Sequence, residues 1–123
     1  MDEAEPGDTL GDVIRKARLR QQLSLREVAS QVGVTFAYIA DIERDRRLPS
    51  EQTATSLARC LQLDLDELLA RAGRLGAQAE RYLQRHPAAG LLLRRIADRN
   101  LSTTQLEQLL AEVARLAGDA PAR

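Results

Sequence analysis

Apolar residues return every three or four positions along most of this chain, and small polar residues stand just before each such stripe. This spacing is typical of amphipathic helices, because residues three and four apart share one face of a helix. The first stripe predicts a helix that begins at Leu10, is capped by Asp8 or Thr9, and stops at the polar stretch QQLS. Its apolar face contains Leu10, Val13, Ile14, Ala17 and, at its end, Leu19.

Two further helices are predicted on either side of a very tight turn at Gly33. The stretch SLRE at 24–27 has the form of a capping box, so a helix is expected over 25–32. Gly33 ends that helix, because glycine adopts the left-handed conformation at little cost. Thr35 is the N-cap of a third helix, which runs from Phe36 to about Arg44. Two helices joined by such a turn form a helix-turn-helix unit.

Two more short helices complete a small bundle. Ser50 caps a fourth helix, and Asp64 with Glu67 forms a capping box before a fifth, which fades at Ala72–Gly73. We therefore expect an all-α fold in which five helices over residues 10–73 form one core. The inward positions are expected to be Val28, Ala29, Val32, Ile39, Ile42, Ala54, Leu57, Ala58, Leu61, Leu65, Leu68 and Leu69.

The stretch GRLGAQ, which contains Gly73 and Gly76, marks a boundary inside the chain. A second segment over residues 77–117 is expected to be helical and to form a C-terminal oligomerisation or regulatory unit. Its helices are predicted over 78–84 and 88–97, separated by His86-Pro87, with a turn at Arg99-Asn100 and a last helix capped by Ser102 and Gln105.

The last helix carries the apolar stripe from which we expect dimerisation. Segments below about 70 residues rarely bury an adequate core alone, so a second copy of this segment is the simplest cover for the stripe. The residues concerned are Leu106, Leu109, Leu110, Val113 and Leu116, followed by Ala117. The two ends of the chain, residues 1–9 and 118–123, are expected to be a disordered acidic tail and a frayed tail.

Composition adds a charge asymmetry to this picture. The chain has 123 residues, with 18 basic and 18 acidic side chains and only 2% aromatic residues, so its core must be aliphatic. Residues 1–9 hold four acids and no base, whereas residues 10–59 hold nine bases and six acids, a net charge of +3. The neutral total therefore hides a mildly basic module behind an acidic segment. With no long apolar run and no leader pattern, a cytoplasmic protein without membrane insertion is expected.

Catalytic and metal-binding patterns are not found in the sequence. Cys60 is expected to be a small buried residue, and one cysteine with one histidine, His86, offers too few ligands for an ordinary zinc site. His86 precedes Pro87 and is interpreted as a helix-entry residue rather than a general base. We expect no enzyme activity, no metal and no cofactor.

The stretch LREVASQVGVTFAYIADIERDRRLPS resembles the Cro and phage-repressor type of helix-turn-helix regulator, the XRE family. The shared features are Ala29 where two helices cross, Gly33 in the turn, Val34 and Ile39, and a basic turn that leads into Pro-Ser. The resemblance implies that the third helix enters the major groove of operator DNA. It also implies that Arg18 and Glu43 form an internal ion pair. The residues implied in DNA binding are Arg26, Thr35, Phe36, Ala37, Tyr38, Asp41, Arg44, Arg46 and Arg47.

Three positions depart from the family pattern. Leu25 replaces a glutamine that often contacts DNA, Phe36 and Ala37 replace polar base-contacting residues, and Asp45 replaces a frequent glycine. Phe and Ala contact the thymine methyl group but form no bidentate hydrogen bond, whereas Asp41 can accept from cytosine N4 or, alternatively, only pair with Arg44. Binding is therefore expected to depend on arginine–phosphate contacts and DNA shape. The expected outward face of the third helix consists of Phe36, Ala37, Ala40 and Asp41.

The segment RNLSTTQLEQLLAEVARL is similar to the helical oligomerisation tail of Sin-type biofilm repressors, and its placement also suits repressors controlled by a partner metalloprotease. The function expected is a homodimeric transcriptional regulator, a repressor since no activation surface is recognisable, bound to a double-stranded operator. The alternative from another class is an antitoxin or interaction module, whose C-terminal helices bind a toxin, protease or anti-repressor and whose DNA binding is only autoregulatory. Operator sequence, inducing signal and the choice between dimer and tetramer stay open.

Overall fold

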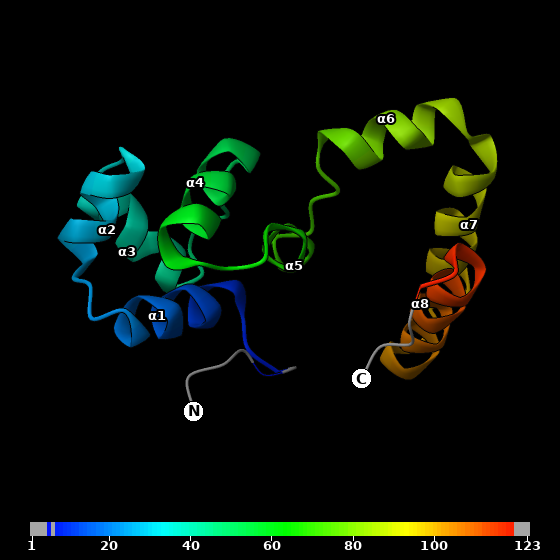
Figure 1. Ribbon diagram of the computed structural model, residues 1–123, viewed down its shortest axis with the longest axis horizontal. Coiled ribbons are helices and arrows are strands. Elements are labelled where there is room, and N and C mark those ends of the chain that lie inside the picture. Colours follow the sequence, from blue (N-terminus) through cyan, green and yellow to red (C-terminus); the bar gives the residue numbers. More distant parts are fainter. Residues whose placement is uncertain (1–4, 6, 120–123) are drawn as a thin grey trace. The chain divides into compact units, whose positions relative to one another are not determined.

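The computed structural model describes residue 5 and residues 7–119, and every regular element in them is a helix, as the all-α prediction requires. The chain divides into two compact units, one ending at Gln78 and one beginning at Ala79. The first unit contains α1 (Leu10–Arg20), α2 (Leu25–Val32), α3 (Phe36–Glu43), α4 (Glu51–Leu61) and α5 (Leu65–Arg71). It is followed by α6 (Ala77–Arg85), α7 (Pro87–Asp98) and α8 (Thr103–Ala117) (Figure 1).

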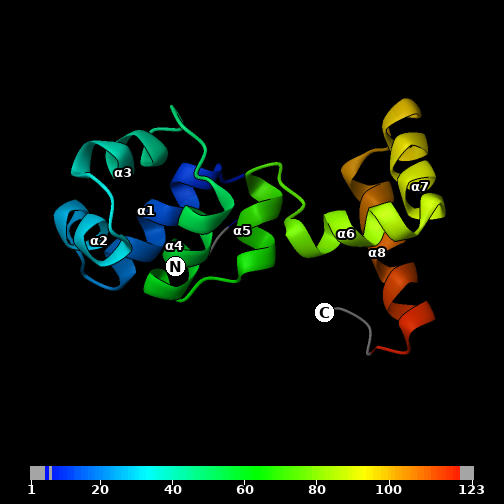
Figure 2. The ribbon, with the colours of Figure 1, turned by 90° about the horizontal axis from the view of Figure 1, so that it is seen from above.

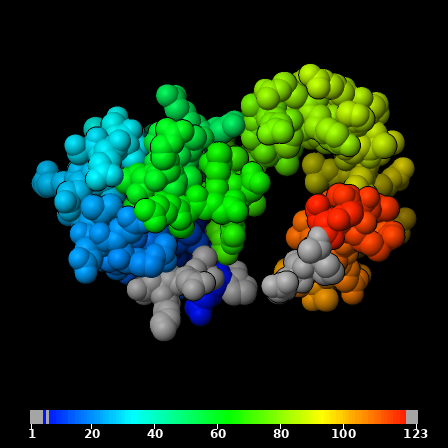
Figure 3. All heavy atoms as spheres, viewed as in Figure 1, coloured from blue at the N-terminus to red at the C-terminus, as the bar shows by residue number. Residues whose placement is uncertain are grey.

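The first unit encloses an aliphatic core to which all of its helices contribute. Figure 2 shows α2 and α3 on the side of the unit opposite α5, and in the space-filling view the atoms of α1 to α5 form one continuous body (Figure 3). Helix α3 packs on α1 and α2, while α4 packs on α1, α2 and α5. The core residues are Leu10, Val13, Ile14, Ala17, Val28, Ala29, Ile39, Ile42, Ala54, Leu57, Ala58, Leu61, Leu68, Leu69 and Ala72. Of the residues predicted to face inward, Val32 and Leu65 are only partly buried, and Leu19 is exposed.

Local caps set the limits of the helices around the tight turn. Ser24 accepts from the backbone N–H of Glu27, whose carboxylate accepts from Ser24 N–H at 2.8 Å, so the predicted capping box is confirmed. Gly33 ends α2 with φ +85°, and Thr35 caps α3 through Tyr38 N–H. The predicted helix over 25–32 is therefore confirmed. The third helix ends at Glu43, one residue before the predicted end.

Gly11 and Asp45 allow the start of α1 to lie close to the end of α3. A Cβ atom on Gly11 would lie 2.4 Å from the backbone carbonyl oxygen of Glu43, so only glycine permits this close approach. Asp45 adopts φ +59° and accepts from Gly11 N–H at 2.9 Å and from the Thr9 hydroxyl at 2.7 Å. Its carboxylate also lies near the positive end of α1, where an anion is stabilised by the helix dipole. The aspartate that departs from the family pattern thus joins the two helices.

We expect Gly11→Ala to lower the free energy of unfolding by about 1–3 kcal/mol, since the added methyl group meets rigid backbone. Gly90→Ala is the matched control. Gly90 lies inside α7, a Cβ atom added there would meet nothing within 4 Å, and alanine is the better helix former, so that variant is expected to be neutral or stabilising. Urea unfolding followed by circular dichroism measures both variants. Equal stability of Gly11→Ala and the parent protein would contradict the close approach.

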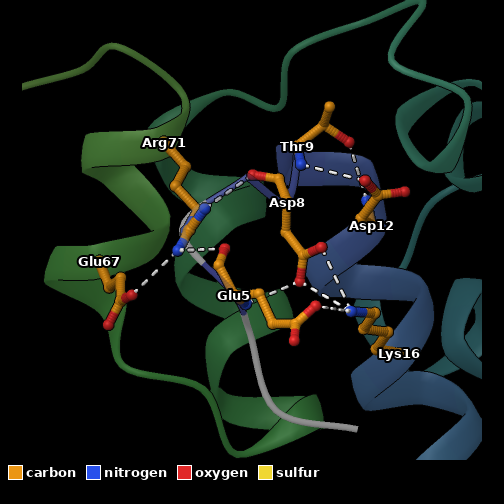
Figure 4. A network of polar contacts seen from close by, with 7 residues as sticks. All are labelled: Glu5, Asp8, Thr9, Asp12, Lys16, Glu67 and Arg71. Atoms are coloured by element: carbon orange, nitrogen blue, oxygen red, sulfur yellow. Dashed lines mark hydrogen bonds and ion pairs between the residues drawn. The ribbon is translucent and has the colours of Figure 1, made fainter.

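The acidic segment before α1 is partly anchored rather than a disordered tail. Asp8 accepts from Lys16 Nζ at 2.9 Å and from Glu5 N–H at 2.8 Å, and its backbone carbonyl accepts from Arg71 at 2.7 Å (Figure 4). The Glu5 N–H and the Lys16 ammonium hold the pKa of Asp8 below its usual value. The N-cap of α1 is Thr9, which forms a capping box with Asp12. The prediction of a disordered tail is corrected for Glu5 and Asp8, because cations of α1 and α5 bind them. Residues 1–4 and 6 of the predicted tail lie outside the described residues.

The remaining differences between the predicted and the observed helices concern residues at helix ends. Asp64 caps α5 through Glu67 N–H, but Glu67 does not complete a capping box and its carboxylate accepts from Arg71 instead. Helices α6 and α7 extend the predicted ranges by one residue at each end. Gly118 and Asp119 donate backbone hydrogen bonds to the last turn of α8, so they cap that helix rather than fray; residues 120–123 of that predicted tail lie outside the described residues.

The second unit buries none of its helical residues fully and leaves many of its large apolar residues exposed. Ser102 and Gln105 form the predicted capping box at the start of α8. No residue of α6, α7 or α8 is buried, although α7 and α8 are amphipathic. The large exposed apolar residues of this unit are Tyr82, Leu91, Leu92, Leu93, Leu106, Leu110, Val113 and Leu116. Among the described helices, none is both long enough and apolar enough to cross a bilayer.

Candidate nucleic-acid interface

Helix α3 packs against the core through its inner face, and the side chains of its first two residues are exposed. Ile39 and Ile42 are fully buried, whereas Phe36 is 41% exposed and Ala37 is also exposed. Tyr38 and Asp41 are half-buried. Ala40 is only 9% exposed, so the prediction that its side chain is outward and exposed is wrong, although it shares the helix face of Phe36 and does not belong to the core cluster. Thr35, the N-cap, is exposed beside Phe36.

The pair Arg18 and Glu43 joins α1 to the last residue of α3. Arg18 Nε donates to Glu43 Oε2 at 2.7 Å and Arg18 Nη2 donates to Oε1 at 3.0 Å. Arg18 Nη1 also donates to the carbonyl of Leu23 at 3.0 Å. The side chains are 12% and 6% exposed. A planar guanidinium satisfies both carboxylate oxygens at once, so this pair sets the orientation of α3 as well as its distance from α1.

Four arginines surround α3 without an ionic partner. Arg44 follows the last residue of the helix, Arg46 and Arg47 lie in the turn beyond it, and Arg26 lies in the first turn of α2. All four are exposed, and no carboxylate of the described residues lies within 4.0 Å of their guanidinium nitrogens. The open alternative that Asp41 pairs with Arg44 therefore finds no support in the geometry. These cations are available to an external anion.

Two of these arginines form cation–π contacts with aromatic residues of α3. Arg26 Cζ lies 4.8 Å from the ring centroid of Phe36, and Arg47 Cζ lies 4.8 Å from the ring centroid of Tyr38. The sequence predicts a DNA-binding role for all four residues, but it does not predict which arginine contacts which ring. The partners are nine or ten positions apart on different elements, so no helical period joins them. An exposed phenylalanine beside unpaired arginines is the one signal of the contact.

Metal-binding and nucleophilic side chains are few among the described residues. No group of three or more His, Cys, Asp or Glu side chains among them lies close enough to hold a metal ion. Cys60 is half-buried on α4, its thiol lies 3.0 Å from Gln31 Oε1, and burial raises its pKa. His86 is the N-cap residue of α7; its ring stacks on Tyr82 and its Nδ1 lies 3.1 Å from the Tyr82 carbonyl oxygen.

The residues expected to mediate dimerisation lie along α8. Leu110, Val113 and Leu116 are 69%, 58% and 71% exposed, while Leu106 is 37% exposed and Leu109 is half-buried. Exposed aliphatic side chains at this spacing form a stripe on one helix face. Within the second unit, the described residues leave this stripe largely exposed.

Comparisons with known proteins agree with this geometry. The helix-turn-helix family model (HTH_3) matches residues 14–68. The transcriptional regulator ClgR of Mycobacterium tuberculosis is 38% identical over 81 residues, which cover 66% of this chain and 72% of that protein. The ImmF control region 10 kDa protein of Bacillus phage phi105 is 37% identical over 62 residues, covering 50% of this chain and 69% of that protein.

Among solved structures, a chain of a SinR protein/SinI protein complex matches with a TM-score of 0.49 and 22% identity, covering 90% of this chain and 100% of that chain. The residues matched by the family model include the turn, the exposed third helix and the arginines described above. The chain belongs to the XRE-type helix-turn-helix family of DNA-binding transcriptional regulators.

Proposed function

We propose that this protein is a homodimeric repressor that binds an inverted-repeat operator with α3 in the major groove. The observation that carries the proposal is the set of four exposed arginines around α3, none with a carboxylate partner in the described chain. Exposed cations at these positions can pair with an external anion, and the phosphates that flank a major groove lie on both sides of an inserted helix. A dimer bound in this way represses by occupying promoter DNA.

The side chains of α3 divide into two proposed roles. Arg44, Arg46 and Arg47 contact phosphates, since they cluster at the C-terminal end of the helix. Phe36 and Ala37 face the bases and favour a thymine methyl group, while Asp41 accepts from cytosine N4. Thr35 lies at the N-terminal end of α3, where a helix terminus favours a phosphate. This assignment makes most of the affinity electrostatic and leaves few direct base contacts.

Two copies are needed because one short helix contacts only a few base pairs. Two-fold repressors place their recognition helices in half-sites about 34 Å apart, one turn of DNA. The exposed stripe on α8 supplies the surface for association, and burial of such leucines stabilises a dimer by roughly 25 cal/mol for each Å² removed from water. We propose that α8 pairs with α8 of a second copy around a two-fold axis.

We expect operator affinity to fall steeply with salt, by about 0.9 log units per log unit of salt for each phosphate contact. Arg44→Ala and Arg46→Ala should each weaken binding to every sequence and lower the salt slope by about one contact. Selection from random DNA with the full-length protein, followed by titration at several salt concentrations, measures both effects. Arg59→Ala on α4, an exposed arginine outside the proposed surface, is the control. Failure of the wild-type protein to enrich any sequence at low salt would contradict the proposal.

One observation favours a second candidate, a protein-interaction module. Helix α7 exposes Leu91, Leu92 and Leu93, which are 56%, 54% and 45% exposed. Consecutive residues point about 100° apart around a helix, so one α8–α8 contact does not cover all three. A regulatory partner such as an anti-repressor, a protease or a toxin would then bind residues 77–117. Deletion after Gly76 separates the two candidates: loss of operator binding supports the homodimer, and retained binding with loss of a stoichiometric partner supports the module.

A further inference from the structure

The stacked pair of Arg26 and Phe36 lies where the base-contacting side chains of α3 are expected. Arg26 is the second residue of α2 and Phe36 the first residue of α3, and the guanidinium carbon is 4.8 Å from the ring centroid. Polar base-contacting residues usual at the first positions of α3 are replaced by Phe36 and Ala37, which offer no hydrogen bond. The arginine therefore brings side-chain donors beside two positions that have none of their own.

The contact with the Phe36 ring leaves the N–H donors of Arg26 without a hydrogen-bond acceptor among the described residues. Arginine carries five N–H donors in one plane, enough to serve two acceptors side by side. No hydrogen bond or ion pair of Arg26 side-chain nitrogens occurs among the described residues, and the side chain is exposed. The ring also restricts the rotamers of a long, flexible side chain before DNA is bound. Such an arginine is preorganised for a planar acceptor pair.

The position of the guanidinium favours a base over a phosphate. It lies against the first residue of α3, which enters the groove, and not at the helix end where Arg44, Arg46 and Arg47 cluster. In the major groove guanine presents the two acceptors O6 and N7, and arginine bidentate to this pair is the commonest specific contact. The neighbouring Ala37 is too short to compete for the same edge.

We propose that Arg26, held on the ring of Phe36, is the main specificity-determining residue and binds one guanine through O6 and N7 in each half-site. Phe36 is a positioning residue that fixes the guanidinium, in addition to any contact of its own with a thymine methyl group. The inference rests on the proposed function, because it requires α3 to lie in the major groove.

The test compares base preference across matched variants of the full-length protein. Wild-type protein is first used to select its operator, and affinity is then measured for that duplex and for duplexes in which each conserved guanine is changed to adenine. At one guanine per half-site the wild-type ratio is expected to be about 5- to 150-fold. Arg26→Ala should reduce this ratio to near one, and Arg26→Lys should lower it, since lysine keeps the charge but not the planar pair of donors.

A second pair of variants isolates the ring. Phe36→Leu keeps an apolar side chain but removes the stacking surface, so it should lower the preference for guanine several-fold; Phe36→Tyr keeps the ring and should retain it. Replacing the same guanine by 7-deazaguanine, which lacks the N7 acceptor, should weaken the wild-type complex and leave the Arg26→Ala complex unchanged. Arg47→Ala, which removes the other stacked arginine, should weaken binding to all sequences alike.

The outcomes separate this inference from the proposed function. If Arg26→Ala lowers affinity for the guanine and adenine duplexes by the same factor and reduces the salt slope by about one contact, Arg26 contacts a phosphate and the inference is overturned. If Phe36→Leu leaves the preference for guanine unchanged, the positioning role of the ring is overturned. If wild-type protein selects no sequence, the proposed function fails before these variants are compared. Circular dichroism spectra of the variants identify any loss of folding.

Discussion

Glu43→Ala is expected to lower the free energy of unfolding by about 2–4 kcal/mol, because it leaves the largely buried Arg18 guanidinium without its carboxylate. Two charge-assisted hydrogen bonds of 2.7 and 3.0 Å are lost, and one bond of Arg18, to the Leu23 carbonyl, remains. Urea unfolding measured by circular dichroism gives the stability. Because Glu43 is the last residue of α3, the same variant should also weaken operator binding at temperatures where it is folded.

The double variant Arg18→Met with Glu43→Leu is the control for this effect. Apolar residues of similar size remove both charges together, and replacing a buried ion pair in this way is often neutral or stabilising. We expect the double variant to recover most of the stability lost in Glu43→Ala. A loss below about 1 kcal/mol in the single variant would show that solvent already screens the pair. That result would contradict its assigned structural importance.

The helix limits of the first unit are predictable because they depend on local chemistry. A serine or threonine cap acts within three residues of itself, so Ser24, Thr35 and Ser50 define the starts of α2, α3 and α4 wherever the chain lies in space. Gly33 ends α2 for an equally local reason. The 3.6-residue period then assigns the core face, and Leu57 and Leu61 are fully buried as it predicts.

The sequence does not predict contacts between residues that lie far apart along the chain. Nothing in a local pattern shows that Asp45 accepts a hydrogen bond from Gly11, 34 residues away, or that the Glu43 carbonyl excludes a side chain at Gly11. The prediction of a disordered tail is wrong at Asp8 for the same reason, since Arg71 lies 63 residues further along the chain. These contacts depend on how the helices pack, which charge and periodicity do not determine.

In the candidate site, too, local features are predictable from the sequence and contacts between distant residues are not. Arg44, Arg46 and Arg47 are predictable as a basic cluster after α3, because they lie close together in the sequence. The low exposure of Ala40 is not, since the helix period places it on the same face as Phe36 and Ala37. The pairing of Arg26 with Phe36 requires the angle between α2 and α3, which only the folded unit provides.

Leu110→Arg is expected to convert the proposed dimer into a monomer and to weaken operator binding by about 100-fold or more. A second recognition helix held on the same dimer binds at high effective concentration, and its loss removes a factor of about 10²–10⁴ in affinity. Leu110 is 69% exposed within its own chain, so arginine there costs the isolated fold little but would place unpaired charges in an apolar contact. Light scattering gives the mass, and titration with the selected operator gives the affinity.

Gln108→Arg controls for the added charge. Gln108 lies on the same helix two residues earlier, on the polar face opposite the stripe, and is exposed. This variant should stay dimeric and bind the operator at least as tightly as the parent protein, whereas Leu110→Arg should not. If Leu110→Arg remains a dimer with unchanged affinity, α8 does not mediate association. The exposed leucines of α7 then become the surface to test, because they are the other large apolar group of the second unit.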